Sequence, residues 1–171
     1  MIVCATNTTV DVNRGAMTFG GNLMQNLQNL FAPGTGFLRS LGNSALISAV
    51  TTLLALLVSS MAGYGFEVFR TRARDRVFNI LLISMMIPFA TLMIPLFRIF
   101  GRLNDMGFSF MGLNSYAAVI LPSISTAFLI FFFRQNTKSF PKDILEAARI
   151  DGLGEVHIFF RMYMPVMRST Y

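Results

Sequence analysis

Charged residues are scarce in this 171-residue chain, making up 13% of it, whereas 54% of the residues are hydrophobic. Tryptophan is absent, and cysteine and histidine occur once each, as Cys4 and His157. A single cysteine excludes an intramolecular disulfide framework and a cysteine-based zinc site, and a lone histidine does not indicate metal binding. Because ordinary soluble domains carry more charge, this composition indicates a membrane protein.

Motifs for enzymatic chemistry are also missing. The chain has no G-x-x-x-x-G-K-[ST] loop to hold nucleotide phosphates and no H-E-x-x-H motif. Its apolar runs contain no paired carboxylates, and no nucleophile stands with a base. We therefore expect no enzymatic activity, no catalytic residue and no cofactor.

What the chain does have is three long apolar runs, at residues 44–66, 77–97 and 116–133, none of which contains Asp, Glu, Lys or Arg. A helix needs roughly 20 mostly apolar residues to cross the hydrocarbon core. Only helices and closed barrels satisfy their backbone polar groups in lipid, and helices buried in a soluble core would show amphipathic stripes. The runs therefore predict an all-α integral membrane protein with three transmembrane helices.

Two features of these runs leave alternatives open. Small residues recur at about four-residue steps in the first run, ending at Gly63, and such a face packs either within the chain or against another subunit. Pro88, Pro95 and Pro122 either interrupt helices that line a path through the membrane or are ordinary prolines of membrane helices.

The net charge of +6 is distributed unevenly, with most of the 14 basic residues in the link between the first two runs and after the third. By the positive-inside rule, residues 67–76 and 134–171 are cytoplasmic, whereas residues 1–43 and 98–115 are outside. The positive charge thus reflects membrane topology, and we expect no nucleic-acid partner. The predicted organisation is an external segment, a transmembrane region and a cytoplasmic segment, at residues 1–43, 44–133 and 134–171.

The cytoplasmic segment predicts two short amphipathic helices joined by a glycine turn. The first starts near Pro141, where a missing N–H costs little, and ends at Gly152, which suits the left-handed conformation of a helix cap. On this helix we expect an apolar face and a charged face that forms ion pairs, made respectively of Phe140, Ile144, Ala147 and Ala148, and of Lys142, Glu146 and Arg149. On the second helix we expect an apolar face made of Val156, Phe159, Phe160 and Tyr163.

This segment resembles the EAA signature of the membrane subunits of ABC-type importers, which reads Glu-Ala-Ala, three residues, Gly, nine residues, Ile, one residue, Leu-Pro. The residues that match in register are Glu146, Ala147, Ala148, Gly152 and Pro165. Met162 and Met164 stand where that family usually has Ile and Leu. Together with ATNTTVDVNRG, LGNSALIS and AGYGF, the segment is similar to the carbohydrate-uptake branch, in particular to the second permease of maltose- and lactose-type systems.

The resemblance implies a permease of the cell inner membrane, built on a six-span fold. Residues 1–4 would be the tail of a first span, and the last two spans would lie beyond Tyr171. The helix around Glu146, Ala147 and Ala148 would dock into a groove of a cytoplasmic ATP-binding subunit, with Gly152 setting the angle between the two short helices. Asp151 either caps the turn or contacts that partner.

Further implied partners are a second permease subunit, an extracytoplasmic solute-binding protein and the lipid bilayer, and the implied cargo is a sugar or oligosaccharide. A different function class is a small oligomeric three-span channel or carrier that ATP does not drive. The absence of charged residues in the apolar runs speaks against an ion or proton route through them. For Glu146, the alternative to docking is a solvent-exposed surface ion pair.

Overall fold

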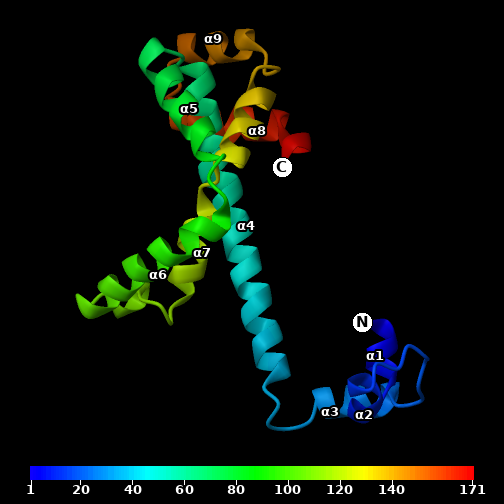
Figure 1. Ribbon diagram of the computed structural model, residues 1–171. Coiled ribbons are helices and arrows are strands. Elements are labelled where there is room, and N and C mark those ends of the chain that lie inside the picture. Colours follow the sequence, from blue (N-terminus) through cyan, green and yellow to red (C-terminus); the bar gives the residue numbers. More distant parts are fainter. The chain divides into compact units, whose positions relative to one another are not determined.

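The computed structural model describes residues 1–171 and contains helices as its only regular secondary structure, which confirms the predicted all-α fold. The chain divides into two compact units, Met1–Leu46 and Ile47–Tyr171. Figure 1 labels the elements of both units.

The first unit contains three short helices, α1 (Ile2–Thr6), α2 (Thr9–Asn13) and α3 (Leu23–Leu30). The apolar residues Leu23, Leu27 and Leu30 recur at helical spacing along α3. Thr8 caps α2, since its hydroxyl accepts a hydrogen bond from the Asp11 amide at 3.2 Å.

Polar side chains, rather than an apolar core, hold this unit together. Asn7 is its one buried residue and donates to the Thr18 carbonyl at 2.7 Å. Asn26 on α3 donates to the carbonyls of Ala5 and Asn7 at 2.9 and 3.0 Å. Gly20 lies so close to Asn7 that a Cβ there would meet the Asn7 Oδ1 atom. The many Asn and Thr residues of this segment thus connect the loops to the helices.

The longest helix is α4 (Phe37–Val68), which starts seven residues before the predicted 44–66 run. It and the stretch Tyr116–Thr137 are long and apolar enough to cross a membrane. At a rise of ~1.5 Å per residue, 32 residues exceed the ~30 Å hydrocarbon core by several turns.

The predicted 77–97 run does not form one straight helix. It is divided between α5 (Arg72–Ser84) and α6 (Phe89–Asp105), which are bent by 102°. Pro88 is the N-cap of α6 and lacks a backbone N–H, and a proline also disfavours helical geometry in the residue before it. The structure therefore has two candidate spans and a third only if this bent pair counts as one span.

The 116–133 run is interrupted more gently, between α7 (Tyr116–Ile124) and α8 (Ala127–Thr137). Pro122 lies inside α7, and Ser125 leaves the helical conformation with ψ 87. The Thr126 hydroxyl then caps α8 by accepting from the Leu129 amide at 3.4 Å. Ser109–Met111 forms a short 3₁₀ turn, η1, between α6 and α7.

Helix α4 approaches α8 closely at Gly63, the last of the small residues that recur along the first run. Ala55, Ser59 and Gly63 are buried, whereas Ser48 and Thr52, earlier on the same face, are exposed. A Cβ at Gly63 would lie 2.7 Å from the Phe133 Cβ atom. The sequence left open whether this small-residue face packs within the chain or against another subunit. Its second half packs within the chain.

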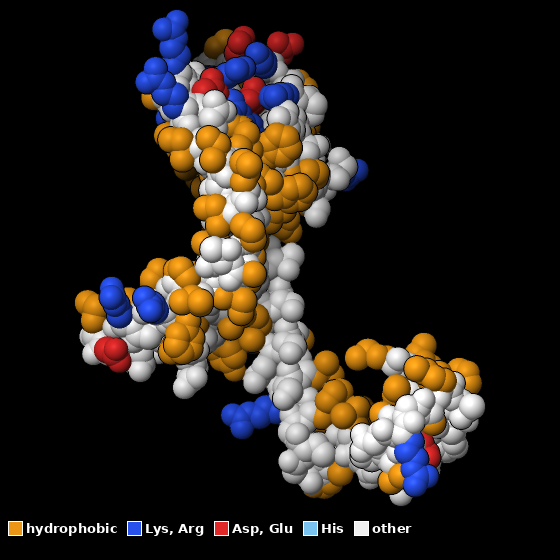
Figure 2. Space-filling view, viewed as in Figure 1, with side chains coloured by type: hydrophobic (Ala, Val, Ile, Leu, Met, Phe, Trp, Pro, Cys, Tyr) orange, Lys and Arg blue, Asp and Glu red, His pale blue; other side chains and the backbone are white.

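The C-terminal helices are α9 (Lys142–Ile150), α10 (Glu155–Ile158), the π-helical turn η2 (Phe159–Tyr163), α11 (Met164–Val166) and the 3₁₀ turn η3 (Arg168–Thr170). They pack around Tyr64 near the end of α4, in a cluster defined here as the Tyr64 cluster. Its buried members are Tyr64, Phe140, Leu145, Ala148, Ile158, Phe159, Tyr163 and Met167. Charged side chains gather over α9 and the start of α5, at this end of the second unit (Figure 2).

Candidate partner-docking site

Helix α9 ends in a complete Schellman cap, which the sequence predicted only in part. Gly152 has φ 78, in the left-handed region that favours glycine. Its amide donates to the Arg149 carbonyl at 3.1 Å, and the Leu153 amide donates to the Ala148 carbonyl at 3.0 Å. Leu153 also packs against the Tyr64 cluster. The glycine turn is therefore a defined bend anchored at both ends.

We expect Gly152→Ala to destabilise this bend by roughly 1–2 kcal/mol, since a Cβ is disfavoured at positive φ. Open space surrounds the position, so the cost arises from the backbone alone. Gly154→Ser is the control, because Gly154 has φ −72 and equally open space, and serine suits its N-cap position. Thermal unfolding in detergent micelles compares the two variants, and equal losses would contradict the proposed cause.

The two alanines of the EAA signature lie on different sides of α9. Ala148 is 1% exposed and packs in the Tyr64 cluster together with Leu145, whereas Ala147 is exposed. The predicted apolar face that joined Ala147 with Ala148 is therefore wrong. Successive residues are rotated by ~100° on a helix, so both cannot meet the same contact, and Leu145 takes the inward position.

The exposed side of α9 carries residues at i, i+3, i+4 and i+7 spacing, defined here as the outer face: Asp143, Glu146, Ala147 and Ile150. Ile150 is 86% exposed, and the sequence analysis did not assign it to either face of the helix. Asp151 is the exposed C-cap residue, beside the exposed Gly152. The structure therefore brings Glu146, Ala147, Asp151 and Gly152 onto one accessible stretch.

Pro165 does not lie on this stretch. It is an exposed residue at the start of α11 and lines an apolar groove with Leu53, Leu57 and Tyr171. Pro165 has no N–H to donate to the carbonyl four residues back, and the π-helical turn η2 ends two residues before it, at Tyr163.

That π-helical turn also changes the predicted face of the second helix. Ile158 and Tyr163, five residues apart, are both fully buried, as a π-helical spacing allows. Val156 and Phe160, which were predicted to be on the apolar face, are 67% and 45% exposed. Phe159 is buried, as predicted.

The ion pairs expected within α9 do not form, and Arg149 pairs instead with a residue beyond the end of this helix. No ion pair joins Glu146 to Lys142 or Arg149. Arg149 Nε instead donates to Glu155 Oε1 at 2.7 Å, across the glycine turn. The hydroxyl of Tyr64 donates to the other oxygen, Glu155 Oε2, at 3.0 Å.

The electrostatics of this contact favour an ionised Glu155. Partial burial by itself would raise the pKa of Glu155, but the hydrogen bonds from Arg149 and Tyr64 outweigh it, and the pKa lies below its ordinary value. The same hydrogen bond raises the pKa of Arg149. The carboxylate stays charged at neutral pH, so the bridge persists.

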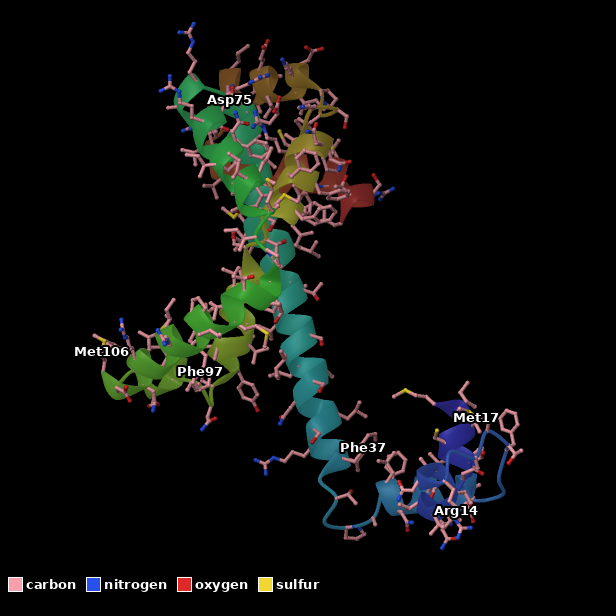
Figure 3. All side chains as sticks on the ribbon, in the orientation of Figure 1. Arg14, Met17, Phe37, Asp75, Phe97 and Met106 are labelled. Atoms are coloured by element: carbon pink, nitrogen blue, oxygen red, sulfur yellow. The ribbon has the colours of Figure 1, made fainter.

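A second polar contact, which sequence reasoning also missed, joins α4, α5 and α8. Arg134 on α8 is 6% exposed and donates to Glu67 Oε2 at 3.1 Å and to Asp75 Oδ1 at 2.5 Å. Its guanidinium lies 4.1 Å from the ring centroid of Phe78 on α5. Asp75 lies in the first turn of α5, at the charged end of the unit (Figure 3). Arg134 directly follows the apolar run 116–133, and the sequence analysis used this arginine only to assign membrane topology.

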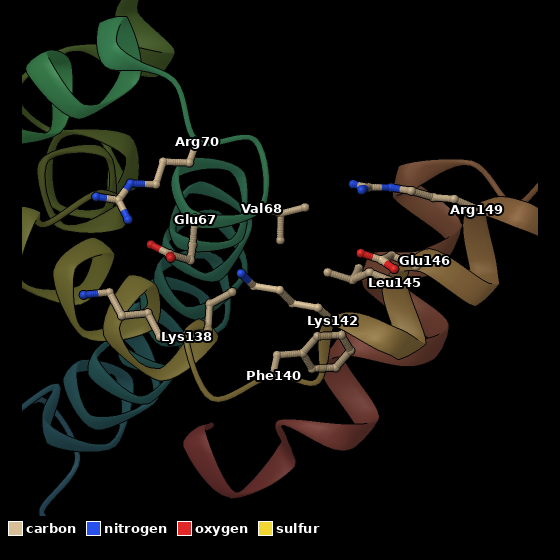
Figure 4. A pocket seen from close by; sticks show the side chains of 10 residues that line it. Glu67, Val68, Arg70, Lys138, Phe140, Lys142, Leu145, Glu146 and Arg149 are labelled. Atoms are coloured by element: carbon tan, nitrogen blue, oxygen red, sulfur yellow. The ribbon is translucent and has the colours of Figure 1, made fainter.

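Between α9 and the ends of α4 and α8 lies a pocket of about 360 Å³ with a mixed-charge lining (Figure 4). Lys142, Glu146 and Arg149 line it from α9, opposite Glu67 and Arg70. Neither this pocket nor any other part of the chain gathers three His, Cys, Asp or Glu residues that could hold a metal ion.

Residues 55–171 match the model of the family described as binding-protein-dependent transport system inner membrane component. The chain belongs to this family. The match covers the second half of α4 and every later element, including the outer face of α9. This family consists of transport components, which agrees with the prediction of a multi-pass membrane protein without enzymatic activity and confirms the family expected from the EAA signature.

The curated relatives of this transport component are permease proteins. The chain is 48% identical over 171 residues to the lactose transport system permease protein LacG of Rhizobium radiobacter, covering 100% of this chain and 60% of the relative. It is 44% identical over 126 residues to the arabinooligosaccharides transport system permease protein AraQ of Halalkalibacterium halodurans, covering 74% and 43%. The sn-glycerol-3-phosphate transport system permease protein UgpE of Pectobacterium atrosepticum is 29% identical over 175 residues, covering 98% and 60%.

The chain thus spans 60% or less of the length of these relatives. No solved structure matches it.

Proposed function

We propose that this chain acts as a permease subunit of an ATP-driven importer of sugars or oligosaccharides, in which α9 docks onto a cytoplasmic ATP-binding subunit. The observation that carries the docking role is the outer face of α9. It combines the exposed Glu146 with the small Ala147 and an isoleucine that is 86% exposed, on a helix whose other side is anchored by Leu145 and Ala148. An exposed isoleucine beside a small residue offers apolar area that a closely approaching partner can cover.

Two observations support the proposed partners: the family description and the lack of a phosphate-binding loop in residues 1–171. The family description names a binding protein, and residues 1–171 contain no phosphate-binding loop, so we assign nucleotide binding to a separate subunit. We assign to the assembly an ATP-binding subunit, a second permease and an extracytoplasmic solute-binding protein. The basic segments 67–76 and 134–171 are assigned to the cytoplasmic side, and residues 1–43 and 98–115 to the outside.

The cargo assignment rests on the relatives. Those named for lactose and arabinooligosaccharides are more similar to this chain than the one named for sn-glycerol-3-phosphate. Sugars and oligosaccharides are therefore the proposed substrate class, with lactose as the first probe. A three-span channel that ATP does not drive is not favoured by any contact in the structure.

The docking role is tested with Ala147→Trp in the permease reconstituted with the ATP-binding subunit. We expect at least a tenfold weaker affinity between the two proteins, because a large side chain at a close contact costs more than about 1.4 kcal/mol. Lactose-stimulated ATP hydrolysis should fall in parallel, while membrane insertion stays at the wild-type level, since Ala147 is exposed.

Val156→Trp is the matched control, because Val156 is an exposed apolar residue on α10 rather than on α9. Its affinity for the ATP-binding subunit should match that of the wild-type permease. Unchanged affinity and unchanged stimulated hydrolysis in Ala147→Trp would refute docking through the outer face.

A further inference from the structure

The carboxylate of Glu155 joins two helices through two different oxygens. Oε1 accepts from Arg149 on α9 at 2.7 Å, and Oε2 accepts from the hydroxyl of Tyr64 on α4 at 3.0 Å. The residues joined in this way are far apart in the chain, since 91 positions separate Tyr64 from Glu155. One side chain thus connects the helix that carries the outer face to the helix that runs through the apolar region.

The α4 end of this connection is held firmly. Tyr64 is 4% exposed, and its ring packs edge-on against Phe159 and Tyr163 with centroid distances of 5.4 and 5.0 Å. A buried phenol requires a hydrogen-bond partner for its hydroxyl, and Glu155 supplies it. The ring therefore has little freedom to turn away when Glu155 moves.

The α9 end is held in a different way. The guanidinium of Arg149 lies 5.7 Å from the ring centroid of Phe69, so it contacts the chain just after α4 in addition to Glu155. Leu145 and Ala148 also pack α9 onto the Tyr64 cluster, but apolar contacts are non-directional and permit sliding. The charge-assisted hydrogen bonds of Glu155 are directional and weaken steeply when they are distorted.

We propose that Tyr64, Glu155 and Arg149 form the link through which a displacement of α9 is transmitted to α4. This inference rests on the proposed function, in which a partner moves α9. Tyr64 and Glu155 are positioning residues, because they contact neither cargo nor nucleotide and act by fixing the distance between the two helices. When the link is broken, α9 can still dock, but a displacement of α9 displaces α4 less than in the wild-type protein.

The test is Tyr64→Phe, which removes one hydroxyl and keeps the ring. In proteoliposomes with the complete transporter, lactose uptake per ATP hydrolysed should fall roughly two- to thirtyfold, the range that corresponds to lost coupling of 0.5–2 kcal/mol. The affinity of the permease for the ATP-binding subunit should stay at the wild-type value.

Tyr163→Phe is the matched control. Tyr163 is fully buried in the same cluster, and its hydroxyl lies 2.6 Å from Thr137 Oγ1, which keeps its own bond to the Phe133 carbonyl. This variant loses an equally buried hydroxyl that does not contact Glu155. Its thermal stability should drop as much as that of Tyr64→Phe, while uptake per ATP hydrolysed stays unchanged.

Glu155→Gln and the double variant with Tyr64→Phe show whether both residues act through one link. If they do, the double variant is no worse than the more affected single variant. The proposal would be overturned if Tyr64→Phe kept the wild-type uptake per ATP hydrolysed, or if Tyr163→Phe lost as much of it. It would also be overturned if the losses in uptake per ATP of the two single variants multiplied in the double variant. If Tyr64→Phe does not accumulate in the membrane, Glu155→Gln against Tyr163→Phe gives the same comparison. Failure of the proposed function is distinct, since the wild-type permease would then not bind the ATP-binding subunit.

Discussion

Arg134→Ala should lower the free energy of unfolding by about 3–5 kcal/mol, the cost of breaking a buried ion pair by removing one partner. The Arg134 side chain is 7% exposed, and its removal leaves Glu67, which is 17% exposed, without a cation. Asp75 loses its contact with α8 at the same time. Thermal unfolding of the purified permease in detergent measures the loss.

Arg70→Ala provides the comparison for Arg134. Arg70 pairs with the same Asp75 at 3.2 Å, but its side chain is 62% exposed. A solvent-exposed ion pair contributes little to stability, so this variant should unfold close to the wild-type temperature. Equal losses in the two variants would show that the burial of Arg134 does not determine its contribution.

Gly63→Ala should separate α4 from α8 and destabilise the second unit by roughly 1–3 kcal/mol, the usual cost of overpacking. The new Cβ would lie 2.7 Å from the backbone nitrogen of Arg134 and 2.7 Å from the Phe133 Cβ atom. Both atoms belong to the body of α8, so neither can swing aside as a flexible side chain would.

Gly65→Ala, two residues further along α4, is the matched control for Gly63. A Cβ there meets nothing within 4 Å. Because alanine favours helix over glycine by ~1 kcal/mol, this variant should be neutral or more stable. A destabilised Gly65→Ala would indicate that any side chain in this part of α4 is harmful, and that the contact at Gly63 has no special role.

The parts of the fold that the sequence predicted are those that depend on composition and local backbone chemistry. Apolar runs indicated the helices, and Gly152 indicated the end of α9, because hydrophobicity and left-handed φ are properties of single segments. The prolines were noticed, but the sequence did not distinguish the 102° bend before Phe89 from the milder break after Pro122. Local rules state that a proline disturbs a helix and do not state the angle that results.

Sequence reasoning failed for contacts between segments. The pairing of Arg149 with Glu155 rather than with Glu146 depends on Tyr64, which lies in another helix and holds the Glu155 carboxylate in place. Ala148 points inward because it packs in the Tyr64 cluster, which also includes residues of other helices. A helical wheel gives the angles between residues but not the direction of the core, so Ala147 was placed on the wrong side.

The exposed Ile150 links the chain's folding to its assembly. Covering an isoleucine side chain completely is worth about 1.5–3 kcal/mol, and the isolated chain forgoes this gain. A partner that binds the outer face only when α9 is folded adds its binding free energy to the stability of the chain by mass action. The amount of partner in the cell would thus regulate how long each newly made copy survives proteolysis, in addition to whether it works.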